Sequence, residues 1–199
     1  VLNNEFDTIY HEHINFFNTN SMNELAKRAN LDLIDVIKTP IHGTSYVFVF
    51  SKLLKRENHI SNIIKSESKL LNTQTYIDWE ASTIANMTVL KSTIDNLKRE
   101  GYKVIGYGAA AKGNTLLNYI DTPLDLIIDD SPLKQNLYAP GTNSPIKSVD
   151  ALKEFSKETK IVFMPLAWNF FTEISQRIKS VRNEPHDKFL KYFPNVEVV

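Results

Sequence analysis

The chain of 199 residues contains no cysteine. Within it, disulfide bonds, thiolate zinc sites and a cysteine nucleophile are therefore excluded, and a chain without cysteine is typical of a cytoplasmic protein. Basic and acidic residues both number 23, so the net charge is zero. Because nucleic acids and acidic membranes bind basic surfaces, neither is an expected partner. No apolar run approaches the roughly 18 residues that a membrane-spanning helix needs.

What the sequence does contain is the composition of an ordinary globular protein. Hydrophobic residues make up 42% and charged residues 23%, which is enough apolar material for a substantial core. The length suits one large domain, or one and a half small ones. A cluster of reactive side chains, Tyr10-His11-Glu12-His13, follows soon after Val1. Since a cut or processed chain would bring such a cluster close to its start, we expect part of a parent protein to be missing.

The first half of the chain predicts a strand pair followed by helices. Residues 31–37 and 46–50 have the apolar, β-branched pattern of strands, and the short loop between them favours an antiparallel pair. Before them, Ser21 with Glu24 three residues later predicts a helix N-cap at Ser21. After them, apolar residues recur three and four apart over 57–100. This spacing predicts a long helix, or a helix pair, that packs across the domain.

The second half of the chain alternates strand and helix. A β-α-β order of this kind predicts a parallel sheet with helices on both faces, so we expect a Rossmann-like α/β fold. We expect two parts: residues 1–75, with the strand pair and the reactive cluster, and residues 76–199, with the sheet. The expected elements of the sheet part are, in order, strand 103–107, helix 112–119, strand 124–129, helix 149–155, strand 160–164, helix 169–181 and strand 188–193.

A glycine turn follows the first of these strands. The stretch Gly106-Tyr107-Gly108-Ala109-Ala110-Ala111 fits the pattern G-x-G-x-x-A between a strand and a helix. There, small residues let the backbone approach a ligand, and the helix N-terminus favours a phosphate. Lys112 adds a cation, and Asp129 at the end of the next strand suits an acid that hydrogen-bonds ribose hydroxyls. The pattern favours a nucleotide site over a tight turn that binds nothing.

Two later segments fall at the same predicted edge, where open α/β sheets bind ligands. The loop 131–147 holds three prolines, which favour an ordered shape, and loops of this length are usually functional or disordered. Trp168 and Asn169 follow a later strand. Trp168 can stack on a base while Asn169 bonds its edge, or Trp168 can fill the helix–sheet interface. Both alternatives stay open.

The cluster near the start of the chain also has two interpretations. In an extended stretch, His11 and His13 share a face and can chelate a metal with His42 as a third ligand. Alternatively, His13 transfers a proton, Glu12 orients it, and Tyr10 donates to a developing oxyanion. Because no acid-rich or second histidine set accompanies the cluster, we favour proton transfer and expect no metal site.

Several motifs form one ordered series along the chain. They are Tyr10-His11-Glu12-His13, His42-Gly43-Thr44-Ser45, the turn from Gly106 through Thr115, Asp129-Asp130-Ser131-Pro132 with Lys134, Pro140-Gly141-Thr142 with Pro145-Ile146, and Ala167-Trp168-Asn169. The series resembles the C-terminal domain of S-adenosylmethionine-dependent sugar C-methyltransferases, which act on nucleotide-linked keto-deoxysugars. The resemblance covers nearly the whole chain.

The resemblance implies a division of labour between domains. In that family, a small zinc domain and a methyltransferase domain that binds S-adenosylmethionine precede a Rossmann-like domain that holds the sugar nucleotide. The family's Y-x-E-H residues match Tyr10, Glu12 and His13. By this match His13 is the base that removes the proton next to the sugar ketone. Glu12 orients His13, and Tyr10 positions the substrate or steadies the enolate.

The implied partners are a nucleotide sugar and the N-terminal domains missing from this chain, and the implied cofactor is S-adenosylmethionine. Thr44 in place of a second glycine, and Tyr46-Val47 in place of Leu-Arg, depart from the family and leave the sugar undefined. An NAD-dependent oxidoreductase domain and a non-catalytic sugar-nucleotide-binding module are the alternatives. The expected substrate-binding residues are His42, Gly106, Gly108, Ala110, Lys112, Asn114, Thr115, Asp129, Ser131, Lys134, Thr142, Trp168 and Asn169.

Overall fold

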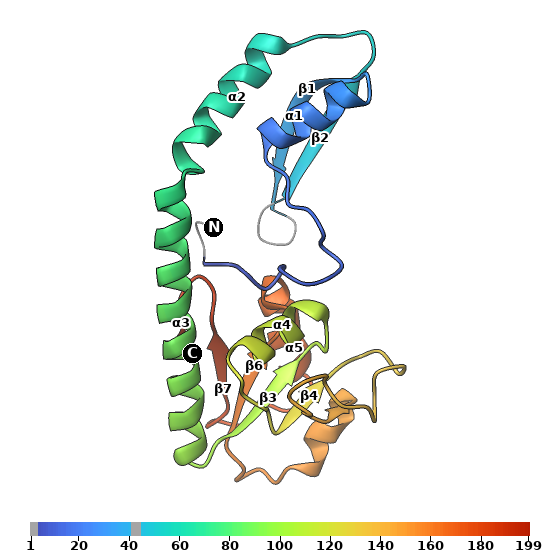
Figure 1. The fold of residues 1–199 in the computed structure, drawn as a ribbon. Helices are drawn as coiled ribbons and strands as arrows, with labels where there is room; N and C mark the ends of the chain where they lie inside the picture. Colours follow the sequence, from blue (N-terminus) through green and yellow to red (C-terminus); the bar gives the residue numbers. More distant parts are fainter. Residues whose placement is uncertain (1–3, 41–44) are drawn as a thin grey trace. The chain divides into compact units, whose positions relative to one another are not determined.

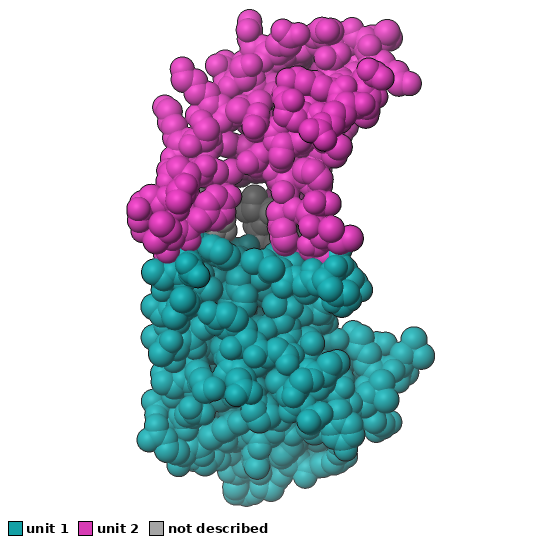
Figure 2. Space-filling view, in the orientation of Figure 1, with its two compact units in different colours: residues 1–12, 79–199 teal, residues 13–78 magenta. Residues whose placement is uncertain are grey.

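A computed structural model describes residues 4–40 and 45–199, which fall into two compact units (Figure 2). The small unit is His13–Asp78, and the sheet unit combines Val1–Glu12 with Trp79–Val199. The first part expected from the sequence, residues 1–75, differs from the small unit at its start. The segment before His13 groups with the sheet because Phe6 is buried in the core of the sheet unit.

The small unit contains the expected antiparallel strand pair and helices (Figure 1). Its elements are α1 (Thr19–Arg28), β1 (Asp32–Thr39), β2 (Ser45–Ser51) and α2 (Glu57–Leu70). Strands β1 and β2 pair antiparallel, as predicted. A compact core forms where Ala26 of α1, Leu33 of β1 and Ile60 of α2 meet. Helix α1, strand β1 and helix α2 thus each contribute one buried side chain to this core.

The start of α1 corrects the predicted N-cap. Asn18, not Ser21, caps the helix: the Ser21 N–H donates to Asn18 Oδ1 at 2.8 Å, and the Asn18 N–H donates to Ser21 Oγ at 3.0 Å. Ser21 is therefore the third residue of a reciprocal capping pair. An amide side chain accepts the free helix N–H as well as a hydroxyl does, so the helix gains almost one turn.

The sheet unit is built on six strands in the spatial order β5-β4-β3-β6-β7-β8. All neighbouring pairs are parallel except β7 and β8, which are antiparallel. The strands are β3 (Lys103–Tyr107), β4 (Leu126–Ile128), β5 (Ile146–Lys147), β6 (Ile161–Pro165), β7 (Lys188–Lys191) and β8 (Glu197–Val198). Strands β4 and β6 are apolar throughout, as is typical of strands covered on both faces.

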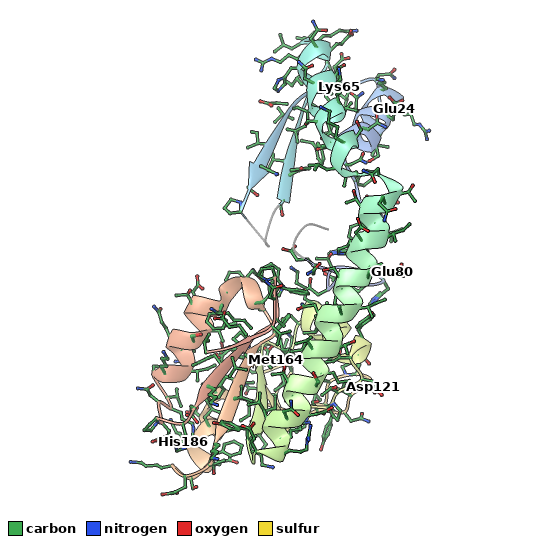
Figure 3. The ribbon with its side chains drawn as sticks, turned by 90° about the vertical axis from the view of Figure 1, so that its left-hand side faces the viewer. Glu24, Lys65, Glu80, Asp121, Met164 and His186 are labelled. Atoms are coloured by element: carbon green, nitrogen blue, oxygen red, sulfur yellow. The ribbon has the colours of Figure 1, made fainter. Side chains whose placement is uncertain are left out.

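Helices cover both faces of this sheet, which confirms the predicted α/β class. On one face, α3 (Thr73–Arg99) and α4 (Ala111–Tyr119) pack on the strands, and Met87, Leu90, Ile94 and Leu97 form the buried stripe of α3. On the other face lie α5 (Phe171–Lys179) and the 3₁₀ helix η1 (Val149–Glu154). Figure 3 shows α3 with its side chains, and Met164 of β6 is fully buried in the core beneath it.

Three predicted elements differ in detail. Residues 149–154 form a 3₁₀ helix, and the expected helix 169–181 begins as the 3₁₀ turn η2 (Trp168–Phe170) before α5. The apolar stripe predicted for the long helix also includes a residue that is not buried, since Ile84 is 50% exposed. Thr83 and Met87 on either side of it are buried, so Ile84 lies outside the buried face of α3. In the described part of the chain, no helix is both long and apolar enough to cross a membrane.

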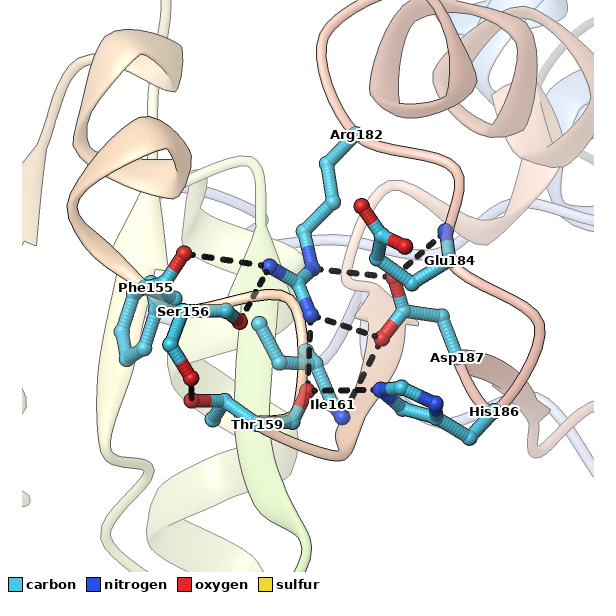
Figure 4. A network of polar contacts seen from close by, with 8 residues as sticks. All are labelled: Phe155, Ser156, Thr159, Ile161, Arg182, Glu184, His186 and Asp187. Atoms are coloured by element: carbon cyan, nitrogen blue, oxygen red, sulfur yellow. Dashed lines mark hydrogen bonds and ion pairs between the residues drawn. The ribbon is translucent and has the colours of Figure 1, made fainter.

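A buried ion pair fastens the loops at the far end of the sheet from the glycine turn (Figure 4). The Arg182 Nε donates to Asp187 Oδ2 at 2.9 Å, and both side chains are at most 6% exposed. The guanidinium also donates to the carbonyls of Ser156 and Thr159. Asp187 in turn accepts from the N–H of Ile161, the first residue of β6. One arginine thus pairs buried polar groups from two loops, the one before β6 and the one before β7.

Candidate functional site

The carboxyl edge of the sheet has one position where the chain changes direction. Strands β3 and β6 are neighbours, but the chain leaves β3 toward β4 and leaves β6 toward β7, on the opposite side. The turns that follow β3 and β6 therefore diverge and leave a crevice, which is where open α/β sheets bind ligands. The Leu166 N–H donates to the Tyr107 carbonyl at 2.8 Å and fixes the two turns side by side.

The turn after β3 is shaped for close approach. Gly108 has φ +98°, a conformation in which an L side chain is strained. Gly113, on the first turns of α4, has no room for a side chain, since a Cβ there would lie 2.7 Å from Leu166 Cβ. Gly106 is buried within β3. Gly113 was not among the predicted site residues, although the sequence signal was a glycine inside a helix.

Helix α4 points its N-terminus at this crevice. Ala110 occupies the N-cap position, and its methyl side chain cannot accept a hydrogen bond from the helix. The first-turn N–H groups therefore lack the usual side-chain acceptor, and the helix dipole makes them attractive to an anion. This is the geometry that the glycine pattern predicted for a phosphate.

Asp129 holds the glycine turn in place. One carboxylate oxygen accepts from the Ala109 N–H at 2.7 Å and the other accepts from the Ser131 N–H at 2.8 Å. Lys134 Nζ lies 3.2 Å from Asp129 Oδ2, and Asp129 is 7% exposed. The structure thus brings together three predicted site residues, Asp129, Ser131 and Lys134. Because both oxygens of Asp129 accept hydrogen bonds from the chain, Asp129 braces the turn.

Tyr107 and Asp130 make a second contact beside this brace. The Tyr107 hydroxyl donates to Asp130 Oδ2 at 2.9 Å. Burial, together with the hydrogen bond to Asp130 and its charge, raises the pKa of Tyr107 to about 12. The phenol therefore stays protonated at neutral pH.

A buried polar group of three residues lies in the sheet unit near the turn after β6. The Trp168 Nε1 donates to Asp7 Oδ2 at 2.8 Å, and Lys112 Nζ lies 5.2 Å from the centre of the Trp168 ring. Asp7 is 1% exposed. Burial raises the pKa of Asp7 above its usual value, although the charge of Lys112 and the hydrogen bond from Trp168 act in the opposite direction. Asp7 was missed because an isolated acid in an irregular segment carries no sequence signal.

Of the two alternatives for Trp168, the structure favours the packing one. Its ring lies 5.6 Å from that of Phe193 and packs against the main core of the sheet unit. Its indole N–H donates to the Asp7 carboxylate. Asn169 follows on the same 3₁₀ turn and is partly exposed. Lys112 Nζ is buried without a hydrogen bond among the described residues, so it lies beside Trp168 and not in open solvent.

The long loop 131–147 is ordered by its own hydrogen bonds. The Asn136 N–H donates to the Ile146 carbonyl and the Ala139 N–H to the Ser144 carbonyl, both at 2.8 Å. Thr142 Oγ1 lies 3.1 Å from Ser144 Oγ, so this predicted site residue contributes to the loop. The Asn118 side chain of α4 donates to the Pro140 carbonyl at 3.0 Å and ties the loop to the helix.

Asn114 and Thr115, the remaining predicted residues of α4, line a cavity of about 770 Å³. A neighbouring cavity of about 210 Å³ is lined by Ala109, Ala110 and Ala111 of the glycine turn. Both cavities lie wholly within the sheet unit. The glycine turn and these two cavities form the candidate site.

The reactive cluster straddles the boundary between the units. Tyr10 and Glu12 belong to the sheet unit, and His13 begins the small unit. Tyr10 is partly exposed, while Glu12 and His13 are exposed. Glu12 Oε1 lies 4.0 Å from His11 Nε2, and the His13 ring meets Phe16 at 6.2 Å. The catalytic roles of Tyr10, Glu12 and His13 stay predictions.

His42 lies outside the described residues, so its predicted role in substrate or metal binding stays a prediction as well. Over residues 4–40 and 45–199, no three histidine, aspartate or glutamate side chains come together as a metal site requires.

A Rossmann-like sheet with an uncapped helix N-terminus at its switch point defines the class: an open α/β domain. Comparison with protein families matches residues 40–194 to the C-methyltransferase C-terminal domain, and the chain belongs to this family. It is also 26% identical over 206 residues to the C-methyltransferase NovU of Streptomyces niveus. That match covers 99% of this chain and 48% of the relative, so the chain spans about half the relative's length.

Proposed function

We propose that this chain is the substrate-binding and base-supplying domain of an S-adenosylmethionine-dependent C-methyltransferase that acts on a nucleotide-linked keto-deoxysugar. The observation that carries the proposal is the uncapped N-terminus of α4 at the strand-order switch, in a member of a C-methyltransferase family. A nucleotide sugar contains a diphosphate, which is the anion that such a helix terminus suits.

The diphosphate would lie against the turn Gly108–Ala111. Gly108 lets the backbone approach, and the first-turn N–H groups of α4 supply donors. Asp129 supports this site from behind, because its hydrogen bond to the Ala109 N–H fixes the turn before any ligand arrives. A preformed site loses less conformational entropy on binding.

The chemistry proposed for the chain itself is one proton transfer. The His13 imidazole takes the proton from the carbon next to the sugar ketone, and the electrons of that C–H bond form the enolate. The Tyr10 hydroxyl donates a hydrogen bond to the enolate oxygen, where negative charge develops. Glu12 orients the His13 ring. Imidazole suits the task because its ordinary pKa lies near neutrality.

The methyl donor is proposed to bind outside this chain. S-adenosylmethionine carries a positive sulfur, and a helix N-terminus with a buried lysine nearby favours anions instead. The site described here therefore does not fit the sulfonium end. In the parent enzyme a separate domain would supply the electrophilic methyl carbon, and this chain would present the enolate to it. We propose the zinc and methyltransferase domains of the family as the partners, and a cytoplasmic location.

One substitution tests the role of His13. In the full-length enzyme that carries this chain, His13→Asn should abolish exchange of the proton next to the ketone with deuterium from solvent, measured by NMR on the nucleotide sugar. Nucleotide affinity should be unchanged, because the diphosphate site lies on other residues. His11→Asn is the matched control, since His11 has no assigned role and should leave exchange intact. Continued exchange in His13→Asn would assign the base to another residue.

Titration separates the proposal from an NAD-dependent oxidoreductase. Calorimetry of this chain should detect a nucleoside diphosphate but neither NAD nor S-adenosylmethionine. Asp129 argues in the same direction, because the acid that would bond the ribose of NAD is already bonded to Ala109 and Ser131. Tight NAD binding would overturn the proposal, and unchanged turnover in His13→Asn would favour a non-catalytic binding module.

A further inference from the structure

The larger cavity of the sheet unit has a wall that none of the functions above explains. Its floor and sides come from the segment before His13, from α3 and from α4, and Phe6, Ile84 and Tyr119 give it a largely apolar surface. The Phe6 and Tyr119 rings pack 4.7 Å apart. At about 770 Å³ it is as large as the pockets that hold small-molecule ligands.

Three buried polar atoms belong to residues that line this cavity, and none has a hydrogen-bond partner among the described residues. They are Trp79 Nε1, Thr83 Oγ1 and Asn114 Oδ1. Thr83 is 5% exposed. An unpaired buried donor or acceptor costs free energy, and native proteins rarely keep several in one place. A ligand that supplies both an acceptor and a donor would remove this cost for all three.

The charge of the cavity excludes the phosphate end of a nucleotide. Glu80, labelled on α3 in Figure 3, is the ionisable acid among its lining residues, and it would repel an anion. The anion-binding turn, by contrast, lines the neighbouring smaller cavity. The two cavities share Asn114 and Pro140 as lining residues, so they adjoin. Asn114 lies about one helical turn beyond the start of α4, a separation that a ribose can bridge.

The apolar walls also disfavour a sugar. A sugar carries hydroxyl groups around its whole ring, and each would need a partner when it leaves water. A planar nitrogen heterocycle has two apolar faces and polar atoms only at its edge. Such a ring fits walls of aromatic and aliphatic side chains with a few polar atoms between them.

We propose that this cavity binds the planar heterocyclic base of the nucleotide, with Trp79, Thr83 and Asn114 as the residues that hydrogen-bond its edge. This inference rests on the proposed function and gives the bound nucleotide a direction. The diphosphate lies at the turn Gly108–Ala111, and the base lies between α3 and α4. It also places the base away from Trp168, whose N–H is used by Asp7.

Calorimetric titration of the 199-residue chain tests the proposal. The probes are uridine, cytidine, adenosine and guanosine diphosphates, with inorganic diphosphate as the base-free probe. At least one nucleoside diphosphate should bind at least about tenfold more tightly than inorganic diphosphate, since a filled apolar cavity and its hydrogen bonds add to the anion contact.

The discriminating variant is Thr83→Val, which removes the hydroxyl and keeps the shape of the side chain. It should weaken the best nucleoside diphosphate about tenfold and leave inorganic diphosphate unchanged. Thr88→Val is the matched control: Thr88 lies on the same helix, is exposed, and its hydroxyl donates to the Ile84 carbonyl. That variant should bind every probe as the parent chain does.

The outcomes separate this inference from the proposed function. If inorganic diphosphate binds as tightly as every nucleoside diphosphate, or if Thr83→Val weakens both kinds of probe equally, the base site is overturned while the anion site stands. If no diphosphate binds, the proposed function and this inference both fail. A second readout is the methyl NMR signal of Ile84, which should shift with the nucleoside diphosphate and stay in place with inorganic diphosphate.

Discussion

Trp168 and Asp7 are 161 positions apart in the chain, and the indole N–H of one donates to the carboxylate of the other at 2.8 Å. This single bond ties the segment that carries Tyr10 and Glu12 to the turn after β6. It lies beside Lys112 on the first turn of α4. The part of the proposed proton-transfer segment that carries Tyr10 and Glu12 is therefore joined to the proposed phosphate site through buried side chains of the sheet unit.

Removal of the indole donor should destabilise the sheet unit. In Trp168→Phe, Asp7 Oδ2 stays buried but loses its partner, which should lower the free energy of unfolding by about 1–3 kcal/mol. Urea denaturation followed by circular dichroism measures the change. Phe170→Leu is the control, since Phe170 lies on the same 3₁₀ turn but is 48% exposed. An equal loss in both variants would show that the hydrogen bond contributes nothing.

Asp7 should also make stability depend on pH. Because burial raises its pKa in the folded state, the folded chain holds this proton more tightly than the unfolded chain does. Protonation of Asp7 therefore stabilises the fold as pH falls through the raised pKa toward the ordinary value of 3.8, and the burial cost of the charge is fully present at higher pH.

The comparison that isolates this effect is with Asp7→Asn, which cannot titrate. The free energy of unfolding of the parent chain should rise relative to that of Asp7→Asn as pH is lowered from 7 toward 4. Urea titrations at several pH values measure the difference. A difference that stays constant over this range would mean that Lys112 fully compensates the buried charge.

The buried ion pair between Arg182 and Asp187 should contribute far more to the free energy of unfolding than an exposed pair does. Arg182→Met should cost about 3–5 kcal/mol, because Asp187 would stay buried without its cation. Lys153→Ala breaks the exposed pair between Lys153 and Asp150, and it should leave the free energy of unfolding unchanged within error.

The double variant Arg182→Met with Asp187→Asn checks the cause. Since the second substitution removes the unpaired charge, the double variant should be more stable than the sum of the two single losses implies. Strict additivity would argue that Arg182 acts through packing alone.

Two glycines with similar backbone conformations should respond differently to alanine. Gly101 has φ +87° and Gly141 has φ +83°, so both substitutions strain the backbone. At Gly101 a Cβ meets no atom of the described chain within 4 Å, so the cost should be about 1–2 kcal/mol. At Gly141 the Cβ would overlap the Asn118 side chain, so Gly141→Ala should cost more and detach the loop 131–147 from α4. Thermal unfolding ranks the two. Addition of Asn118→Ala should recover part of the loss at Gly141 and none at Gly101.

The sequence was sufficient for the fold class because its periodicity is strong. Continuous apolar runs gave β3 and β6, and the spacing of Met87, Leu90, Ile94 and Leu97 gave the buried stripe of α3. Strand β8 was missed, since Glu197–Val198 is two residues long and forms only through its pairing with β7. The N-cap at Asn18 was missed because Asn18 and Ser21, three residues apart, are both residue types that cap helices.

The sequence predicted where the candidate site lies better than it predicted the role of each residue there. The pattern of glycines located the turn at the carboxyl edge, but it gave no sign that Asp129 also braces the Ala109 N–H. Likewise, Trp79, Thr83 and Asp7 looked unremarkable because their importance depends on long-range burial. A pattern records which residues are near in sequence, whereas an unpaired buried atom exists only once distant segments have packed.

The strand order has a consequence for how the molecule is made. The central strand β3 pairs with β6, so Lys103 lies beside Ile161, and the crevice has only one wall until β6 has joined. During synthesis β3, α4 and β4 can assemble early, whereas the neighbour on the other side of β3 is translated much later. One side of an apolar strand therefore lacks its partner during that interval, and unpaired strand edges of this kind are prone to aggregation.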